Sequence, residues 1–468
     1  MNEPLIQARL EKLKELREKG IDPYPARFSR SHTIGEVSAR FSFLKEEKQS
    51  GEQVTIAGRL VALRRMGKAS FLDLRDGSGK IQVHASADRL GEERYRELCS
   101  SDIGDFIGVR GDVFRTKMGE LTVEVAEWSL LSKALRPLPE KWHGLKDIEL
   151  RYRHRALDLV ANQAVREAFV LRSRMVSAMH RFLDARDFLE VETPMMQPIA
   201  GGATARPFVT HHNALDIDLY LRVAPELYLK RLVIGGLERV YELGKSFRNE
   251  GVSTKHNPEF TTLEIYEAYS DYEGMMSLVE ELVAESAQAA MGSTRITYQE
   301  NEIDLSLPWR RIGLVQAVEE ATGLSLDGVT ESDIRKQARK KGIELPELSH
   351  GKLIEHLFER FVEPGLIQPT VVKDYPMDIS PLAKRKQGTE GLVERFELFI
   401  GGVEIANAFT ELNDPIDQRA RFEDQERLRE AGDDEAQRMD EDFLFALEHG
   451  MPPTGGIGIG IDRLAMLF

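Results

Sequence analysis

The chain has 468 residues, of which 41% are hydrophobic and 30% are charged. This length exceeds one ordinary hydrophobic core, so we expect two or more domains of a soluble globular protein. No run approaches the roughly 18 uncharged apolar residues of a membrane span, and the first residues lack the apolar segment of a secretory signal. Cys99 is the only cysteine, which excludes an internal disulfide and a cysteine-based zinc site. These features favour a cytoplasmic protein with no membrane partner.

The formal net charge of −15 is unevenly distributed along the chain. Residues 1–155 carry 29 Lys and Arg against 24 Asp and Glu, whereas residues 156–468 carry 34 against 54. A basic N-terminal third could contact the phosphate backbone of a nucleic acid. Ordinary variation of surface charge explains the same asymmetry, so charge alone leaves both interpretations open.

The N-terminal third divides into three predicted parts. Residues 1–50 contain a helix over 4–19 followed by a lead-in segment. Residues 51–135 contain five short runs of alternating apolar residues separated by turns, a pattern typical of a Greek-key β-barrel of the OB type. Many other all-β modules fit the same pattern. Residues 136–155, which are rich in proline at their start, are predicted to be a linker.

Residues 156–468 are predicted to form a second domain that mixes helices and strands, which makes the whole chain α+β. A mostly helical region at about 313–363 has the character of an insertion between strand-rich stretches. The expected helices are 165–186, 273–291 and 415–449, and the expected strands are 188–191, most of 214–266 and 394–411.

The segment 240–266 carries charged and aromatic side chains at strand spacing. It predicts a strand over 240–247, a loop over 251–258 and a returning strand over 259–266. Period-2 geometry places Arg248 and Glu250 on one face. It places on another face Phe260, Thr262, Glu264 and Tyr266. Carboxylates on inward faces need partners, and either a structural salt-bridge network or a bound ligand would supply them.

The end of the sequence alternates glycine and isoleucine. Gly456, Gly458 and Gly460 fall on one strand face, so a ligand could lie directly against backbone there. A tight barrel-like strand explains the glycines equally well. Arg463 follows where a helix is predicted to begin. The run matches neither a Walker loop nor a dinucleotide-binding fingerprint, because the lysine and the early βαβ position are both missing.

A third cluster combines carboxylates with an amide and consists of Glu397, Glu404, Asn407 and Glu411. Carboxylates near phosphate-binding arginines suggest Mg²⁺ shared with a nucleotide. Glu404 and Asn407 lie three residues apart, so a flat strand would point them to opposite faces, and a common site requires a bulge between them. The adjacent His211 and His212 face apart in a strand, which favours ordinary histidines over metal ligands.

Together these segments resemble the class II aminoacyl-tRNA synthetases, and most closely the lysyl-tRNA synthetases of bacterial type. Motif 1 is similar to residues 165–194, motif 2 to residues 247–260 and motif 3 to residues 456–463. Further similar segments are residues 201–203, 222–227, 256–260 and 410–414. The resemblance covers essentially the whole chain. Members of that family usually continue past motif 3, whereas the given sequence stops at Phe468, so a short last helix is expected.

The resemblance implies an antiparallel catalytic sheet of six or seven strands flanked by helices, and a homodimer built partly by motif 1. It implies a ligase, a lysine–tRNA ligase, that uses ATP and Mg²⁺ to convert L-lysine to lysyl-adenylate. The lysyl group would then pass to the 3′ end of tRNA(Lys). The barrel at 51–135 would be the anticodon-binding domain, and residues 156–468 would be the catalytic domain.

The resemblance also implies roles for individual residues. Arg248 and Arg463 would be the catalytic pair, with Arg248 holding the α-phosphate and the lysine carboxylate, and Arg463 reaching the distal phosphates with His256. Phe260 would stack on adenine opposite Arg463, and Glu250 would meet the adenine amino group. The implied lysine-binding residues are Gly202 and Glu226 for the α-amino group and Glu264, Tyr266, Asn407 and Glu411 for the side-chain ammonium. The implied Mg²⁺ ligands are Glu397 and Glu404, and the implied anticodon contacts are Arg64, Phe71 and Gln82.

Three rival functions are weighed against the residues. An aspartyl- or asparaginyl-tRNA synthetase needs cations in its amino-acid pocket, where this chain has Glu226, Glu264 and Glu411. A relative that transfers lysine to a protein typically lacks the N-terminal barrel. A non-catalytic RNA-binding paralogue would have lost the arginines of motifs 2 and 3. Within the lysine hypothesis, ornithine is the expected troublesome competitor, because one missing methylene is rejected only about 10–200-fold.

Overall fold

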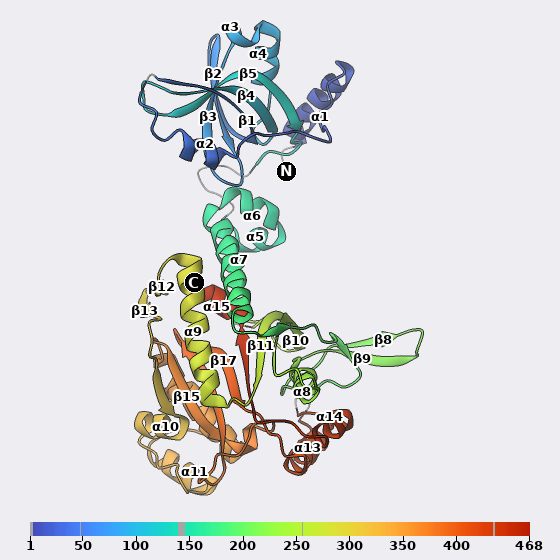
Figure 1. Cartoon of the computed structure of the whole chain (residues 1–468), viewed down its shortest axis with the longest axis vertical. Coiled ribbons are helices and arrows are strands. Elements are labelled where there is room, and N and C mark those ends of the chain that lie inside the picture. Colours follow the sequence, from blue (N-terminus) through green and yellow to red (C-terminus); the bar gives the residue numbers. More distant parts are fainter. Residues whose placement is uncertain (1–2, 47, 139–145, 255, 434–435) are drawn as a thin grey trace. The chain divides into compact units, whose positions relative to one another are not determined.

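The computed structural model describes residues 3–46, 48–138, 146–254, 256–433 and 436–468. It divides into two compact units, residues 1–166 and 167–468, which are described separately here (Figure 1). Residues 139–145, in the predicted linker at 136–155, lie outside the described residues.

The first unit is built on five strands that close into a barrel with the order β1-β2-β3-β5-β4. Only β3 and β5 pair in parallel, and the other neighbours are antiparallel. A helix, α1 (Glu3–Glu18), precedes the barrel as the sequence predicts. The barrel strands are β1 (Gln49–Met66), β2 (Ala69–Arg75), β3 (Lys80–Ser86), β4 (Phe106–Arg115) and β5 (Leu121–Ser132).

Alternation along the barrel strands separates an apolar interior from a polar exterior. Val54, Ile56, Leu72 and Val83 are at most 1% exposed, and they share one core with residues of three short helices. Those helices are α2 (Ile34–Arg40), α3 (Ala87–Leu90) and α4 (Glu92–Cys99). The sequence did not predict them, because segments of four to eight residues are too short for a helical period to emerge.

The second unit is organised by an eight-stranded sheet with the order β14-β15-β16-β17-β18-β11-β10-β6. The expectation of six or seven antiparallel strands is wrong at the edges, where β6 pairs with β10 and β14 with β15 in parallel. The six inner strands are antiparallel throughout. The strands are β6 (Leu189–Glu190), β10 (Arg239–Phe247), β11 (Glu259–Ala268), β14 (Arg310–Gly313), β15 (Thr370–Pro376), β16 (Leu392–Ile400), β17 (Val403–Thr410) and β18 (Thr454–Gly460).

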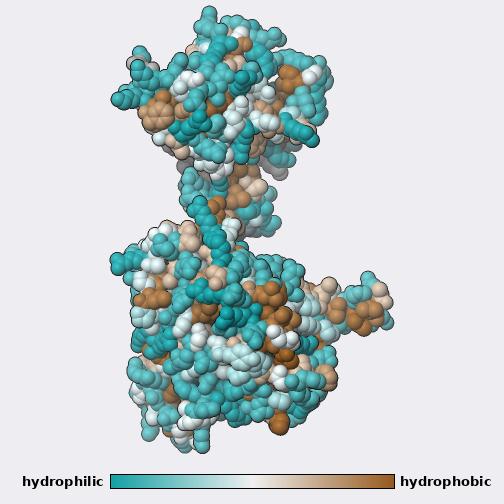
Figure 2. Space-filling model, viewed as in Figure 1, coloured by the Kyte–Doolittle hydropathy of each residue, from teal (hydrophilic) through white to brown (hydrophobic). Residues whose placement is uncertain are grey.

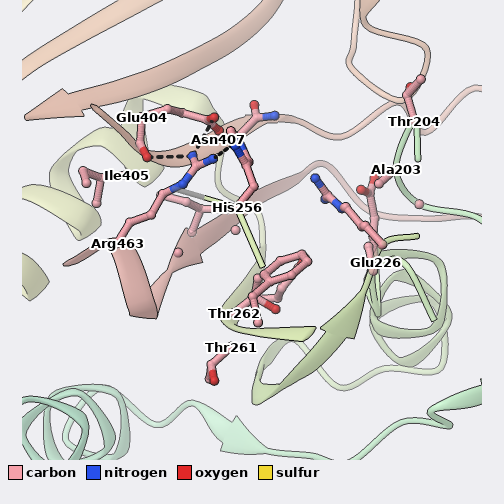
Figure 3. A pocket seen from close by; sticks show the side chains of 18 of the residues that line it. Ala203, Thr204, Glu226, His256, Thr261, Thr262, Glu404, Ile405, Asn407 and Arg463 are labelled. Atoms are coloured by element: carbon pink, nitrogen blue, oxygen red, sulfur yellow. Dashed lines mark hydrogen bonds and ion pairs between the residues drawn. The ribbon is translucent and has the colours of Figure 1, made fainter. Parts of the chain in front are cut away.

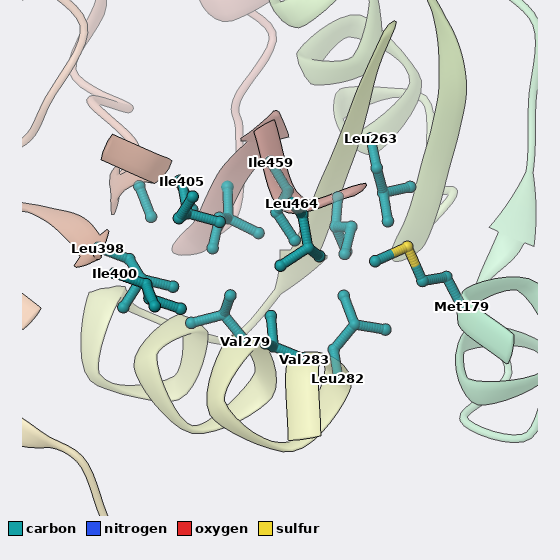
Figure 4. Packing of buried hydrophobic residues seen from close by; sticks show 14 of the residues in the cluster. Met179, Leu263, Val279, Leu282, Val283, Leu398, Ile400, Ile405, Ile459 and Leu464 are labelled. Carbon is teal, nitrogen blue, oxygen red and sulfur yellow. The ribbon is translucent and has the colours of Figure 1, made fainter. Parts of the chain in front are cut away.

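One face of this sheet is covered by the long helix α9 (Tyr272–Met291). Figure 4 shows Val279, Leu282 and Val283 of α9 packed against Ile459 of β18 and Ile405 of β17. Burying each such side chain contributes about 1.5–3 kcal/mol. Helix α7 (Gln163–Asp184) adds buried residues to the same core, so motif 1 is anchored to the sheet.

The second unit also contains further helices and a small second sheet. The predicted insertion contains three helices that share a hydrophobic core with strands β15 and β16, namely α10 (Leu314–Thr322), α11 (Glu331–Lys340) and α12 (His350–Phe361). The charged region 415–449 contains α13 (Pro415–Glu430) and α14 (Glu441–Leu447). A helix that the sequence assigned to strands, α8 (Glu226–Ile234), follows a small sheet of β7 (Met196–Gln197), β9 (Ile217–Leu221) and β8 (Val209–His212).

The β8–β9 hairpin carries exposed apolar side chains. Val209 is 59% exposed, Leu215 64% and Ile217 43%, and Figure 2 shows apolar residues gathered on the projecting hairpin. His211 of this hairpin lies 2.9 Å from Asp218 and 3.3 Å from Asp216. In the part of the chain that the structure describes, no helix is long and apolar enough to cross a lipid bilayer.

Candidate active site

A cavity of about 450 Å³ lies in the second unit and is lined by residues of strands β11, β16, β17 and β18, the segment that follows β10, and the N-terminal end of α8. Most of the residues implied by the resemblance line it, and they are Gly202, Glu226, Arg248, Glu250, His256, Phe260, Glu264, Tyr266, Glu404, Asn407 and Arg463. Among the described residues, the lining does not include Glu397 or Glu411. Glu411 is fully buried next to the cavity, whereas Glu397, the cross-strand partner of Asn407, is partly buried.

The register of β10 and β11 brings the motif 2 side chains together. Ser246 lies opposite Phe260, so the even-numbered positions of both strands face the same way. The strand pattern predicted that Arg248 and Phe260 lie on different faces, whereas the register places both side chains on the same face of the sheet. The Arg248 guanidinium lies 5.1 Å from the centre of the Phe260 ring, which forms one flat, cationic wall.

Strand β17 contains the bulge that a common site for Glu404 and Asn407 requires. Leu398 pairs with Ala406 and Phe399 pairs with Glu404, so Ile405 is an extra residue. Ile405 and Ala406 are consecutively buried in the core, while Glu404 and Asn407 both line the cavity. The condition stated from the sequence is therefore confirmed.

Strand β18 supplies the floor of the cavity with glycines. Gly458 pairs with Glu264 on one side and Asn407 on the other, while Ile459 is fully buried in the core beneath α9. A Cβ added to Gly456 would overlap the Glu411 carboxylate, whereas one added to Gly458 would sit 3.5 Å from Glu264 Oε1. The glycines therefore keep side-chain atoms away from the carboxylates.

Arg463, at the start of α15 (Ile461–Leu467), marks one end of the cavity (Figure 3). Its Nη1 donates to the Glu404 carbonyl and carboxylate, each at 2.9 Å. Its Nη2 lies 3.2 Å from His256 Nε2. Two residues expected to reach the same phosphates are thus adjacent.

Asp462 ties this end of the cavity to motifs 1 and 2. Its Oδ2 accepts a hydrogen bond from the Thr261 amide at 2.9 Å, and its Oδ1 accepts one from Arg172 Nη2 at 3.1 Å. Arg172 belongs to α7 and Thr261 to β11. The start of α15, and with it Arg463, is therefore fixed from two other elements.

Carboxylates crowd the opposite end of the cavity. The Tyr266 hydroxyl donates to Glu264 Oε2 at 3.1 Å. Burial, reinforced by the charge of Glu226, raises the pKa of Glu264 to about 8. Glu411, directly after β17, is fully buried, and burial raises its pKa well above the ordinary value.

A lysine that the sequence pattern did not reveal belongs to this cluster. Lys230 of α8 is fully buried, and its Nζ lies 2.6 Å from Glu226 Oε1 and 2.5 Å from Glu411 Oε2. Two carboxylates assigned to the substrate therefore already share a protein cation. The signal was present as the i,i+4 spacing of Glu226 and Lys230, but it becomes visible only once the segment is recognised as a helix.

Glu397 is likewise held by residues that the sequence analysis missed. It accepts hydrogen bonds from Arg395 Nη2 at 2.6 Å and from the Tyr375 hydroxyl at 2.9 Å. Burial raises the pKa of Glu397 to about 7, against the opposing effect of Arg395. Arg395 Nε also donates to Asn407 Oδ1 at 3.1 Å. In the described ranges, no cluster of three or more His, Cys, Asp or Glu is arranged to hold a metal.

The three residues expected to contact an anticodon lie on one outer face of the barrel. Cross-strand register pairs Arg64 with Phe71, and Phe71 with His84. Gln82 is two residues before His84 on β3 and shares its face. The Phe71 and His84 rings lie 4.9 Å apart. His84 was missed, although the alternation of β3 alone would have placed it beside Gln82.

Two of these side chains are held by neighbours on the same face. Arg64 Nη2 donates to Asp73 Oδ1 at 3.0 Å, and Gln82 Oε1 accepts from Thr122 Oγ1 at 3.0 Å. Burial lowers the pKa of His84, with Glu124 opposing. The face therefore combines aromatic rings with fixed polar groups.

Comparisons with known proteins agree with this geometry. Residues 147–468 match the family model described as tRNA synthetases class II (D, K and N), and residues 54–131 match an OB-fold nucleic acid binding domain. The chain is 56% identical to a lysine–tRNA ligase of Moorella thermoacetica over 99% of its length and 94% of that protein. It is 54% identical to one from Bacillus subtilis, with 99% and 93% covered, and 52% identical to one from Clostridium perfringens, with 98% and 92% covered. The α+β fold and the OB-type domain expected from the sequence are confirmed, and the chain belongs to the class II tRNA synthetases, within them to the lysine–tRNA ligases.

Proposed function

We propose that this cavity joins L-lysine to ATP as lysyl-adenylate and then transfers the lysyl group to the 3′ end of tRNA(Lys). The observation that carries the proposal is the division of charge in one cavity. Glu226 and Glu264 line one end, whereas Arg463 and His256 line the other and Arg248 lies between. An amino acid with a cationic side chain and an anionic triphosphate fit these two ends.

The arginines support the first chemical step. The lysine carboxylate attacks the α-phosphorus, the bond to the bridging oxygen breaks, and pyrophosphate leaves with that electron pair. Such an in-line displacement needs two anions held together and their charge stabilised. Arg248 Nε is buried and has no hydrogen-bond partner among the described residues, so it is suited to an anion. Phe260 beside it offers a face for adenine, and Glu250 an acceptor for the adenine amino group.

The carboxylates support selection of lysine. Glu226 and the backbone of Gly202 would take the α-amino group, and Glu264, Tyr266, Asn407 and Glu411 the side-chain ammonium. Gly456 leaves space above Glu411, whose Oε1 has no hydrogen-bond partner within the described chain. A site built this way rejects an apolar isostere by about 10⁴–10⁵, because its polar groups would lose their partner.

Mg²⁺ fits the neighbouring carboxylates. The negative charge of Glu404 helps to raise the pKa of Glu397. The two carboxylates therefore lie close enough for one bound cation to be attracted by both. Mg²⁺ is typically held by one or two carboxylates together with substrate phosphates. We therefore assign Glu397 and Glu404 to it. When bound, it supplies positive charge that offsets the charge of the triphosphate.

The outer barrel face is assigned to the anticodon within a binding domain of residues 51–135. Phe71 would stack on a base, and Arg64 and Gln82 would read base edges and backbone. Aromatic stacking contributes about 1–3 kcal/mol per base. Residues 156–468 would then hold the amino acid, ATP and the acceptor end of the same tRNA.

A homodimer is supported by exposed apolar residues around motif 1. Phe169 of α7 is 50% exposed, Leu189 of the edge strand β6 51%, and Met196 of β7 56%. Edge strands with apolar residues invite pairing with another chain. The expected mass by light scattering is that of two chains, and a single-chain mass would reject the dimer. Because its substrates are those of protein synthesis, we assign the enzyme to the cytoplasm.

The experiment that tests the proposed function measures two reactions of the purified chain. L-lysine is expected to support ATP–pyrophosphate exchange, and unfractionated tRNA is expected to accept labelled lysine. L-aspartate serves as the control for the rival pocket. Exchange driven by aspartate but not by lysine would reject the pocket assignment, and the absence of both reactions with all substrates would reject an enzyme.

A further inference from the structure

Lys230 contacts two carboxylates of the proposed lysine-binding end, but the proposed function gives it no role. It stands on α8, one turn after Glu226, and its side chain is fully buried. A buried lysine normally carries a large desolvation penalty. The penalty has to be offset by the two carboxylates that its Nζ touches, those of Glu226 and Glu411.

The groups around Lys230 come from several elements. Glu226 lies on its own helix, Glu411 follows β17, and α14 and β17 contribute the rings of Phe443 and Phe409 at 6.0 and 5.4 Å. Burial opposes the ammonium, but the two carboxylates outweigh it and raise the pKa of Lys230. Lys230 is therefore a fixed positive charge.

Three further polar residues act on the same cluster from neighbouring strands. Glu264 and Tyr266 of β11 face Glu226 and Glu411, and Arg395 of β16 acts on Glu226. When a bound cation draws Glu226, Glu264 and Glu411 into their carboxylate forms, these three residues and the charged Lys230 together carry two negative charges. An amino acid with two ammonium groups supplies two positive ones.

Lys230 occupies only part of the capacity of each carboxylate. It lies against Glu411 Oε2, while Glu411 Oε1 faces Gly456 on the cavity floor. It bonds Glu226 Oε1 at 2.6 Å, and Glu226 still lines the cavity. A carboxylate can accept about four hydrogen bonds. Substrate and Lys230 can thus be held by the same two residues at once.

We propose that Lys230 is a built-in counter-ion and positioning residue, which favours the carboxylate forms of Glu226 and Glu411 and holds the two side by side so that the cavity accepts a dibasic amino acid. The inference rests on the proposed function and deepens it. Without Lys230, Glu226 and Glu411 would lose the cation that opposes the effect of burial on their pKa, and they would bind protons more readily. A protonated carboxyl attracts an ammonium far less than a carboxylate does.

The first test replaces Lys230 by methionine, which keeps the length of the side chain and removes its charge. In Lys230→Met, KM for lysine in pyrophosphate exchange is expected to rise on the order of 100-fold, because two buried carboxylates lose their partner. KM for ATP is expected to stay within about twofold, since Arg463 and His256 lie at the other end. In wild type the fall of the lysine KM with rising pH should level off above the pKa of Glu264, about 8, whereas in Lys230→Met it should continue to higher pH, because Glu226 and Glu411 then ionise without a cationic partner.

Three control experiments distinguish a role of Lys230 in positioning the carboxylates from a role in the stability of the fold. Lys336→Met removes an exposed lysine that pairs with Asp333 on α11 and should change no kinetic constant. Lys230→Arg keeps the charge and should recover part of the lysine affinity. In Lys230→Ala, added n-propylammonium or n-butylammonium should lower the lysine KM again by filling the space that the side chain left.

The outcomes distinguish this inference from the proposed function. If wild-type protein shows no lysine-dependent exchange, the proposed function fails and the inference falls with it. If wild type is active and folded Lys230→Met retains the lysine KM and its pH profile, the inference alone is overturned. The same holds if Lys230→Met raises the KM for ATP and lysine equally, or if the alkylammonium ions rescue nothing.

Discussion

At the lysine-binding end of the cavity, Glu264 is 8% exposed and Glu411 is completely buried, whereas at the nucleotide end the Arg463 side chain is 24% exposed and His256 is exposed. The buried end holds its charges in place with a protein cation and a tyrosine. The open end leaves cationic side chains at the mouth of the cavity. Burial strengthens electrostatic interactions and water weakens them. The buried end of the cavity therefore suits selection among amino acids, and the open end suits a large, multiply charged ligand such as a nucleotide.

The largest expected effect on activity comes from substitution of Arg248, which lies between the two ends of the cavity. Arg248→Ala should lower kcat for adenylate formation by about 10²–10³, as the loss of one preorganised donor does elsewhere. Rapid-quench measurement of pyrophosphate release reports the chemical step. Arg231→Ala, on the outer side of α8 in an ion pair with Asp440, is the matched control. A kcat within threefold of wild type would remove Arg248 from the chemistry.

The second prediction compares substitutions of two glycines of the same strand, β18. Gly456→Ala places a methyl group against Glu411 and the Tyr266 ring, whereas Gly458→Ala meets Glu264 at ordinary contact distance. Gly456→Ala should weaken lysine binding by roughly 100-fold, the effect of displacing a buried charge partner, and Gly458→Ala by much less. Calorimetric titration with lysine measures both. Equal losses would mean that the floor beneath Gly456 is not where the ammonium lies.

The barrel provides a third test, away from the cavity. Phe71→Ala should raise KM for tRNA by about 5–150-fold, the equivalent of about 1–3 kcal/mol for one stacked base, and leave pyrophosphate exchange unchanged. Phe114→Ala, whose ring meets His84 at 6.2 Å on the same face, serves as a comparison. A loss of exchange activity in Phe71→Ala would contradict separate roles for the two units.

The smallest expected effect is a pH dependence that belongs to the buried end alone. Glu264 has its pKa raised to about 8, so it is largely protonated at neutral pH when the cavity is empty. Lysine binding favours the carboxylate and releases a proton, so affinity should rise about tenfold per pH unit below pH 8 and level off above it. Calorimetry in buffers of different ionisation enthalpy counts the proton. Glu264→Gln should abolish both effects, and ATP affinity should not follow this profile.

The sequence was sufficient to predict what depends on local spacing. The three-residue separation of Glu404 and Asn407 required a bulge, and Ile405 provides it. The Gly–Ile alternation correctly separated the cavity floor from the core. These predictions hold because period-2 geometry is a property of the strand itself.

Features that depend on tertiary packing could not be predicted from the sequence. Glu397 and Glu411 do not line the cavity, because the strands that bring the other site residues together lie far apart in the chain. Lys230 was missed because its segment was assigned to a strand, which hides an i,i+4 pair. The strand at β6 was predicted, but its parallel pairing with β10 depends on tertiary packing. Strand β14 was missed because four residues are too few for a pattern.

The most direct test of a buried end that recognises a second ammonium compares three amino acids of similar length. We measure kcat/KM in pyrophosphate exchange for L-lysine, L-ornithine and L-norleucine, which lacks the terminal ammonium. The expected result is that norleucine is disfavoured by about 10⁴–10⁵ and ornithine by only about 10–200. Norleucine within about tenfold of lysine would contradict the claim that buried carboxylates select the substrate.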